Sequence, residues 1–129
     1  LYDTAMDRGW DQDHGGLVYG YAPDGSFADA HKYFWVQAEA LAAAWRLYAR
    51  TGEERYRSDY HRLWGWSWDH LIDHEHGAWF RITSREGHKV EPYKSPAGKT
   101  DYHTMGACWD VLSVMPGAAV WNATDRKRK

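Results

Sequence analysis

The chain has 129 residues, which is enough for one domain built around one core. Its net charge is −2 with acidic and basic residues mixed, so it carries no basic pattern for binding nucleic acid. A single cysteine excludes an internal disulfide framework, which makes a reducing, cytoplasmic compartment the expectation, and no apolar run is long enough to cross a membrane.

Helical patterns dominate the chain. Residues 1–9 read as the end of a helix already under way, so we expect a piece of a longer protein. The Ala- and Leu-rich stretch 34–50 contains no Gly or Pro and predicts a long helix. Apolar residues at three- and four-residue steps predict a second helix over 54–71, and a last helix is expected over 101–115.

The segments between these helices carry turn signals. Gly52 either ends the first long helix or lies in the first turn of the next one, where Thr51 and Glu54 have capping-box spacing. The stretches "LVYGY" and "SFA" predict a short β-hairpin around Gly25. The stretches "AWFRI" and "KV" predict another around Gly87.

Two landmarks recur at one offset and indicate an internal repeat. The pair His14-Gly15 returns as His76-Gly77, 62 positions later, and the two hairpin glycines are also 62 positions apart. The motifs "DQDHG" and "DHEHG" predict turns whose Asp and His side chains satisfy backbone groups. The repeated unit is therefore an outer helix, a turn, a hairpin and an inner helix.

A helix pair of this kind buries its apolar faces only against stacked neighbours. Six units of 62 residues would close a ring of about 370 residues. The predicted fold class is all-α, a portion of an (α/α)6 barrel with short β-hairpins on one rim. We expect residues 1–115 to be the C-terminal part of such a barrel and residues 116–129 to be an irregular tail.

The residues resemble the N-acylglucosamine 2-epimerase family, which includes cellobiose 2-epimerases and mannose isomerases. The matching elements are "HGG", a hairpin with "DG", then "KYFWVQAE" and "TGEERY". A second set is "IDHEHGAWF" followed by "KTDYHTMGAC". The resemblance covers about residues 8–112. It implies an (α/α)6 barrel enzyme that moves hydrogen at C1 and C2 of a sugar without a redox cofactor.

The resemblance also implies roles for single residues. His103 of the Tyr-His motif is similar to one of the family's two proton-transfer histidines, and Phe34 and Trp35 match an aromatic pair at the sugar pocket. This pair is usually Trp-Trp in the family. Cellobiose 2-epimerases carry a further Trp where Gly98 stands here, which favours a monosaccharide such as mannose, glucose, fructose or an N-acylhexosamine. At full length a homodimer is expected.

Sugar chemistry explains why a histidine suits this role. Ring opening places a carbonyl at C1, and a base then takes the C2 proton to give an enediolate. Return of the proton to C2 gives epimerisation, whereas its return to C1 gives aldose–ketose isomerisation. Histidine has an ordinary pKa near neutrality and can act in both directions. The alternative for His103 is a helix-start histidine packed beside Tyr102.

Other candidate site residues precede the "VQAE" motif or lie within it. Lys32 could bind a substrate hydroxyl, or pair with a loop carboxylate such as Asp29. Gln37 and Glu39 are two positions apart and point to different sides of the helix, so one faces the barrel centre while the other ties down a neighbouring loop. Trp35 lines the pocket or packs in the core.

Other functions remain open at this level. A glycoside hydrolase would need two inner-helix carboxylates, for which only Glu39 and Asp110 are candidates. A non-catalytic carbohydrate-binding module is the third alternative. No metal is expected, because His70 and His74 lack a third ligand at a defined spacing. Cys108 is expected to be a small buried hydrophobe near the pocket wall.

Overall fold

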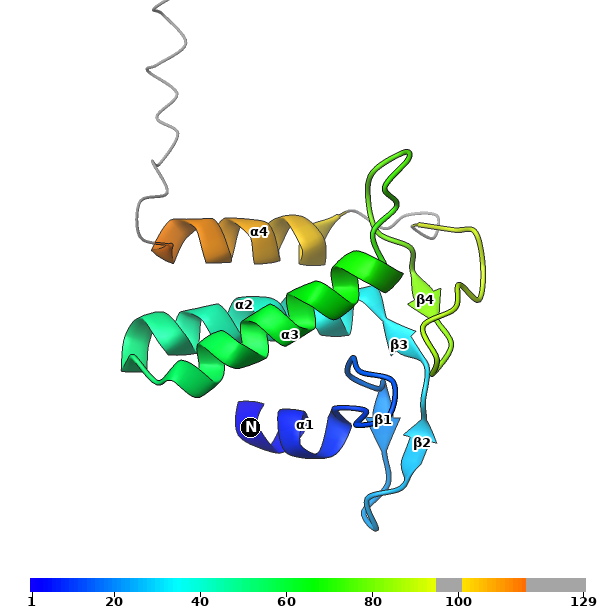
Figure 1. Cartoon of the computed structure of the whole chain (residues 1–129), viewed down its shortest axis with the longest axis horizontal. Helices are drawn as coiled ribbons and strands as arrows, with labels where there is room; N and C mark the ends of the chain where they lie inside the picture. The colour runs from blue at the N-terminus through cyan, green and yellow to red at the C-terminus, as the bar shows by residue number, and fades with distance from the viewer. Residues whose placement is uncertain (95–100, 116–129) are drawn as a thin grey trace, which may run out of the picture.

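The computed structural model describes residues 1–94 and 101–115. Gly98 and the predicted tail over 116–129 lie outside them. Three long helices lie side by side, with the strands gathered at one end (Figure 1). In chain order the elements are α1 (Tyr2–Gly9), β1 (Gly20–Tyr21), β2 (Phe27–Asp29), β3 (Lys32–Tyr33), α2 (Phe34–Thr51), α3 (Glu54–His70), β4 (Ile82–Thr83) and α4 (Tyr102–Val114).

All four helices form where the sequence predicts them, with ends that agree to within one or two residues. Gly52 ends α2 in the left-handed region with φ 72°, and its N–H donates to the Tyr48 carbonyl at 2.8 Å. Glycine adopts this conformation without the steric penalty of a Cβ. The capping-box alternative for this segment is therefore wrong, and no side-chain cap is formed at the start of α3.

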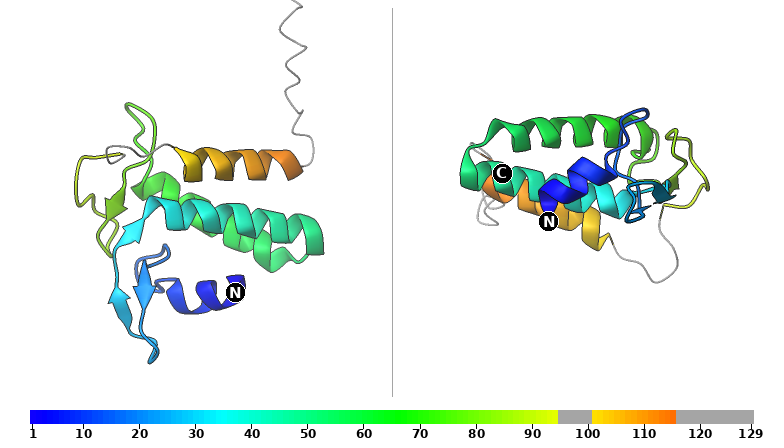
Figure 2. Two further views of the ribbon diagram at one scale, coloured as in Figure 1. Left: turned by 180° about the vertical axis from the view of Figure 1, so that it is seen from behind. Right: turned by 90° about the horizontal axis from the view of Figure 1, so that it is seen from below.

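Helix α2 packs against both α3 and α4 (Figures 1 and 2). Small side chains allow α2 and α4 to approach closely, since Ala38 and Ala42 of α2 form a buried cluster with Ala107 of α4. A second cluster joins α1 and the segment that follows it to α2 and α3. Its buried members are Met6, Leu17, Leu41 and Leu63. Burial of these apolar groups is what holds the helices together.

The two copies of the repeated turn have the same backbone bonds. The carbonyl of Asp11 accepts from the Gly15 N–H at 2.8 Å, and the carbonyl of Asp73 accepts from the Gly77 N–H at 2.8 Å. Each aspartate also accepts two backbone N–H bonds at its Oδ1, from the second and third residues after it. The repeat and the role of its aspartates are confirmed.

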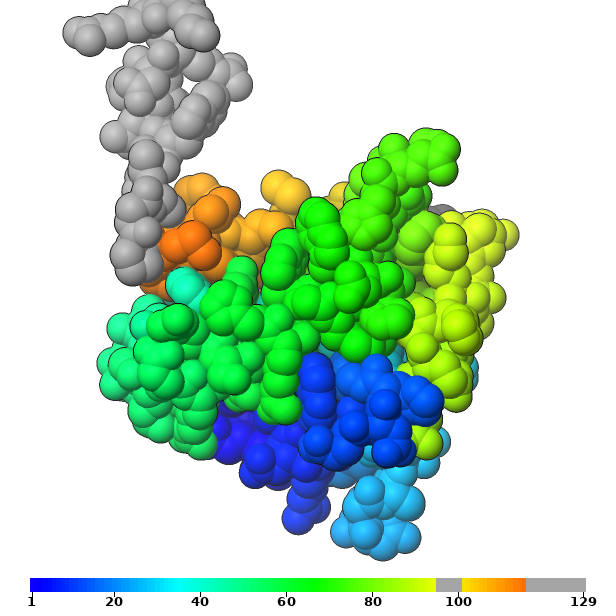
Figure 3. Space-filling model, viewed as in Figure 1, coloured from blue at the N-terminus to red at the C-terminus, as the bar shows by residue number. Residues whose placement is uncertain are grey.

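The strands connect the two repeats at one rim. Strands β1 and β2 form the predicted hairpin around Gly25, whose φ is 88°. The predicted second hairpin forms around Gly87 through the bridge between Thr83 and Lys89. In addition, β4 pairs with β3 of the preceding repeat, which the sequence did not predict. Figure 3 shows the resulting contact, in which the blue first turn lies against the second repeat's yellow-green rim segment.

One face of α4 is open to solvent. Cys108 is exposed, so its expected burial is wrong. Trp109, the next residue, is 70% exposed. The buried positions of α4 are instead Thr104, Ala107 and Val111. Within residues 1–94 and 101–115, every helix is too short or too polar to serve as a membrane span.

Candidate active site

Two polar side chains from different helices meet at the strand-bearing end of the helices. His103 is the second residue of α4, and Glu39 lies in the second turn of α2. The Nδ1 atom of His103 is 2.7 Å from Oε1 of Glu39. The side chains are 33% and 54% exposed, so a small molecule can reach them. A carboxylate at Nδ1 orients the ring and favours the tautomer whose Nε2 can accept a proton.

Aromatic rings surround this histidine. The Trp35 ring is tilted by 35° to the His103 ring with centroids 5.6 Å apart, and Tyr102 lies edge-on at 5.1 Å. Phe34 is only 3% exposed and packs behind His103 with its ring centroid at 6.2 Å. Trp35 is half-buried and contacts Tyr19 from the first hairpin. Trp35 therefore presents an accessible aromatic face next to His103, whereas Phe34 supports it from the core.

Lys32 does not reach this surface. Its side chain is fully buried, and Nζ lies 3.2 Å from Oδ2 of Asp11. Asp29, the ion-pair partner suggested by its place in the sequence, pairs instead with His31 at 2.8 Å. A buried ammonium cannot contact a sugar, so Lys32 is not part of the proposed sugar site. Its partner is a loop carboxylate, as expected, but one 21 residues away.

The charges around Asp11 balance one another. Burial by itself would raise the pKa of the Asp11 carboxyl. Hydrogen bonds from Arg85, the Asp13 N–H and Lys32 outweigh this effect and hold that pKa well below its usual range. Burial also lowers the pKa of Lys32, although the nearby Asp11 carboxylate acts in the opposite direction. Asp11 is thus a buried carboxylate kept charged by its partners.

Gln37 and Glu39 divide the two roles expected of them. Gln37 is fully buried, and its side-chain amide bonds both backbone groups of Leu17. The Leu17 N–H donates to Oε1 at 2.9 Å, and Nε2 donates to the Leu17 carbonyl at 2.8 Å. Gln37 therefore ties the first turn to α2, while Glu39 faces His103. Because Gln37 is fully buried, its amide does not reach the surface beside His103.

Three aromatic residues near the site were not singled out from the sequence as pocket residues. Tyr19 lies 16 positions before Trp35 in the sequence, and the fold brings the two rings together. Tyr102 and Trp109 are both exposed on α4. They help to line a shallow furrow that begins at Glu39; its other lining residues are Met105, Gly106, Ala107 and Asp110.

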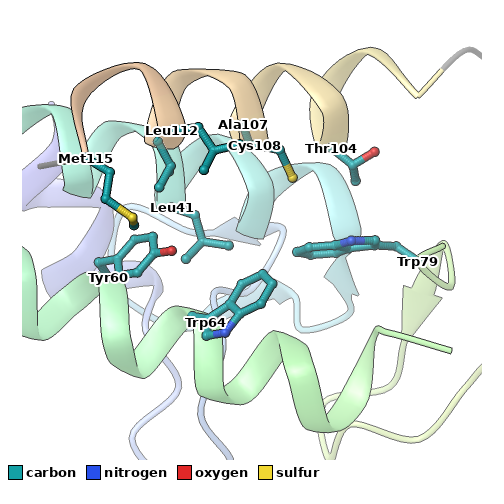
Figure 4. A pocket seen from close by; sticks show the side chains of 10 residues that line it. Leu41, Tyr60, Trp64, Trp79, Thr104, Ala107, Cys108, Leu112 and Met115 are labelled. Atoms are coloured by element: carbon teal, nitrogen blue, oxygen red, sulfur yellow. The ribbon is translucent and has the colours of Figure 1, made fainter. Parts of the chain in front are cut away.

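An apolar pocket lies on a different face, between α3 and α4 (Figure 4). Cys108 lines this apolar pocket, which contains neither His103 nor Glu39, and not the surface beside His103 where the sequence placed it. The side chains that line it are Leu41, Tyr60, Trp64, Trp79, Thr104, Ala107, Cys108, Val111, Leu112 and Met115. Apart from Tyr60 and Thr104, this lining is apolar, and it contains no charged group for orienting a sugar.

The described residues form no metal site. No three His, Cys, Asp or Glu side chains among them gather as a metal site would require. His70 and His74 contact separate backbone carbonyls, those of Gly87 and Trp68. Asp110, one carboxylate of the hydrolase alternative, forms an exposed ion pair with Arg46.

The described residues define a class of protein: a helix-pair repeat with short strands at one rim and an accessible carboxylate–histidine pair beside an aromatic face. The N-acylglucosamine 2-epimerase (GlcNAc 2-epimerase) family matches residues 1–107. The chain belongs to this family, which confirms the resemblance inferred from its motifs.

Individual relatives agree with this assignment. The chain is 56% identical over 115 residues to a D-mannose isomerase of Marinomonas mediterranea, covering 89% of this chain and 29% of that protein. A crystal structure of D-mannose isomerase superposes with a TM-score of 0.84 at 56% identity, covering 88% of this chain and 29% of that one. The structure of cellobiose 2-epimerase from Spirochaeta thermophila gives 0.69 at 33% identity, covering 85% and 27%. The chain thus spans under a third of their length.

Proposed function

We propose that the whole protein to which this chain contributes is a sugar isomerase or 2-epimerase that moves a proton between C1 and C2 of a monosaccharide. The observation that carries the proposal is the 2.7 Å contact between His103 and Glu39 beside the Trp35 ring. Family membership supports the reaction class. The 56% identity to a D-mannose isomerase favours D-mannose as substrate and isomerisation as the outcome.

The chemistry follows from the orientation of the histidine. Glu39 holds the Nδ1 side of the His103 ring, which leaves Nε2 to take the C2 proton of the open-chain aldose. The imidazolium formed in this step is stabilised by the Glu39 carboxylate. Delivery of this proton to C1 of the enediolate, together with transfer of the O2 hydroxyl proton to O1, then gives the ketose. Trp35 would stack on the apolar face of the sugar.

The remaining parts of the proposal concern the whole protein. Residues 1–115 would form the C-terminal part of an (α/α)6 barrel, supported by the 62-residue repeat and by the superposition on D-mannose isomerase. The reaction requires no redox cofactor, because the hydrogen moves as a proton. A homodimer rests on the family resemblance, and a cytoplasmic location on that resemblance and the single unpaired cysteine.

The test follows deuterium from solvent into the sugar. The experiments here and below use the complete enzyme, either as the whole protein or as a chimera in which this chain replaces the matching segment of the M. mediterranea enzyme. In D2O without added cofactor, the complete enzyme should label D-mannose or its ketose product. His103→Ala should lower the labelling rate by at least about 100-fold, because general acid–base catalysis contributes on that scale. His88→Ala, which removes an exposed rim histidine, is the control. A His103→Ala enzyme that labels at the wild-type rate would refute the proposal.

A further inference from the structure

A buried ion cluster lies directly before the helix that carries Trp35 and Glu39. Lys32 and Asp11 are both fully buried and form an ion pair. The Lys32 ammonium also donates to the backbone carbonyl of Arg85 and lies 5.2 Å from the centroid of the Trp66 ring. Lys32 therefore contacts the first turn, the second repeat's rim and helix α3 at the same time.

Arg85 completes the cluster from the second repeat. Its Nε donates to Oδ2 of Asp11 at 2.8 Å, and its Nη2 donates to Oδ1 of Asp11 at 3.1 Å. The same Nη2 lies 2.7 Å from Oδ2 of Asp13. Such a two-pronged contact fixes direction as well as distance. Arg85 thus holds the rims of two neighbouring repeats in one relative position.

No flexible segment separates this cluster from the candidate site. Lys32 and Tyr33 form β3, which pairs with Thr83 and Ile82 of β4, and α2 begins at the next residue. The first N–H of α2, that of Phe34, donates to the Arg81 carbonyl at 3.1 Å. A displacement at Lys32 is therefore transmitted to the first turns of α2.

Stability alone explains this cluster poorly. Removing two charges from water costs several kcal/mol for each ion, and apolar replacements of buried ion pairs are often neutral or stabilising. What such a cluster provides is a defined geometry, because its charges tolerate few alternative arrangements. Trp66 reinforces this geometry: it packs with Phe34 and Leu71, and its Nε1 donates to the His14 carbonyl at 2.9 Å.

We propose that Asp11, Lys32 and Arg85 are positioning residues that fix the start of α2 and so hold Trp35 and Glu39 against His103. The proposal rests on the proposed function for its catalytic consequence, but its structural consequence is independent of any substrate. Lys32 acts through the helix that follows it and does not touch the sugar.

The first test distinguishes the positioning of the catalytic groups from the stability of the fold. Lys32→Met keeps the length of the apolar stem and removes the charge. In the complete enzyme, measured well below its thermal midpoint, kcat should fall about 10- to 100-fold with a smaller change in KM, since small misplacements of catalytic groups have effects of this size. Arg57→Met, which breaks an exposed ion pair with Glu54 on α3, is the matched control and should leave kcat unchanged.

A second pair of variants guards against misfolding. Arg85→Lys keeps the charge of a partly exposed side chain but loses the two-pronged contact, and should give a smaller fall in kcat. Asp11→Asn combined with Lys32→Met removes both buried charges. This double variant should regain thermal stability relative to Lys32→Met while kcat stays low. If kcat recovers together with stability, the cluster is merely structural and the proposal is wrong.

A direct readout needs no catalysis. In enzyme labelled with 15N-histidine, the Nδ1 resonance of His103 reports its contact with Glu39. Lys32→Met should shift this resonance or broaden it, whereas Arg57→Met should not. An unchanged His103 resonance together with an unchanged kcat would overturn the positioning role. A wild-type enzyme without sugar exchange would refute the proposed function and leave this spectroscopic test intact.

Discussion

The two copies of the repeated turn share one backbone structure and differ in their surroundings. In the first copy, Lys32 and Asp11 are both fully buried as an ion pair. In the second copy, the equivalent residues 62 positions on are Lys94 and Asp73, whose Nζ and Oδ2 are 2.7 Å apart with exposures of 29% and 13%. Both repeats therefore form this ion pair, but the pair is fully buried only where a neighbouring repeat covers it.

That neighbour can be named for the first copy. Arg85 lies over Asp11 and Trp66 lies over the glycines that follow it, and both come from the second repeat. In the part of the chain that the structure describes, no residue covers Asp73 in this way. The comparison therefore distinguishes what a repeat forms by itself from what stacking adds. Four variants or conditions sharpen this comparison, from the largest expected effect to the smallest.

Removal of the aspartate should affect the two turns unequally. Asp11→Ala leaves the buried Lys32 charge without its partner, which should lower the unfolding free energy by about 3–5 kcal/mol. Asp73→Ala leaves a partly exposed Lys94 that water can solvate, so its effect should be clearly smaller. Urea denaturation of the complete enzyme measures both. Equal losses would show that burial by the neighbouring repeat does not matter.

Gly16, which ends the first turn, gives a second test of how the neighbouring repeat packs on it. Gly16 has φ +74°, and a Cβ there would lie 2.8 Å from the Trp66 ring and 3.0 Å from Cδ of Lys32. Gly16→Ala should therefore lower the unfolding free energy by about 1–3 kcal/mol through overpacking, in addition to backbone strain. The thermal midpoint of the complete enzyme reports this loss. A midpoint equal to wild type would mean that Trp66 does not pack tightly on the turn.

Acid should weaken the first turn through Asp11. Its folded-state pKa is held below the value in the unfolded chain, about 3.9, so unfolded molecules bind the proton first as the pH falls. The stability contributed by Asp11 is complete above that value and is lost progressively below about pH 4. Asp11→Asn should flatten the pH dependence of the thermal midpoint below pH 4. An identical slope in wild type and variant would contradict the account.

The smallest effect is expected where the second copy departs from the first. Ala78 occupies the position equivalent to Gly16 and has φ 62°, which is unfavourable for a residue with a Cβ. Ala78→Gly should raise stability by about 0.5–1 kcal/mol, because relief of strain outweighs the added freedom of the unfolded chain. The thermal midpoint again provides the measurement, and a decrease would contradict this explanation.

Much of the fold could be predicted from local signals. Helix ends followed from apolar spacing, and the turns followed from glycines at a fixed offset. The long-range partners could not be predicted this way. Sequence proximity suggested Asp29 as the partner of Lys32, whereas in the fold Lys32 bonds the carboxylate of Asp11 and the backbone carbonyl of Arg85. Strand β4 pairs across repeats with β3, and no pattern within the second hairpin reveals this.

The candidate site was predictable by residue type but not by contact. His103 and Glu39 were each expected near the sugar, yet their mutual contact joins positions 64 residues apart. Gln37 and Phe34 belong to the "KYFWVQAE" motif, but their side chains are buried in the core. A helix directs neighbouring residues to different faces, so membership of the motif does not place a residue at the site. The exposure of Cys108 depends on what covers α4, which its own sequence does not encode.

The central claim is that Glu39 holds His103 for proton transfer, and one measurement tests it most directly. The rate of deuterium incorporation from D2O at C1 and C2 should be compared between the wild-type complete enzyme and Glu39→Gln. The substitution keeps the shape of the side chain and removes the charge that stabilises the imidazolium. We predict a fall of at least about 100-fold without loss of folded protein. Incorporation at the wild-type rate would contradict the account.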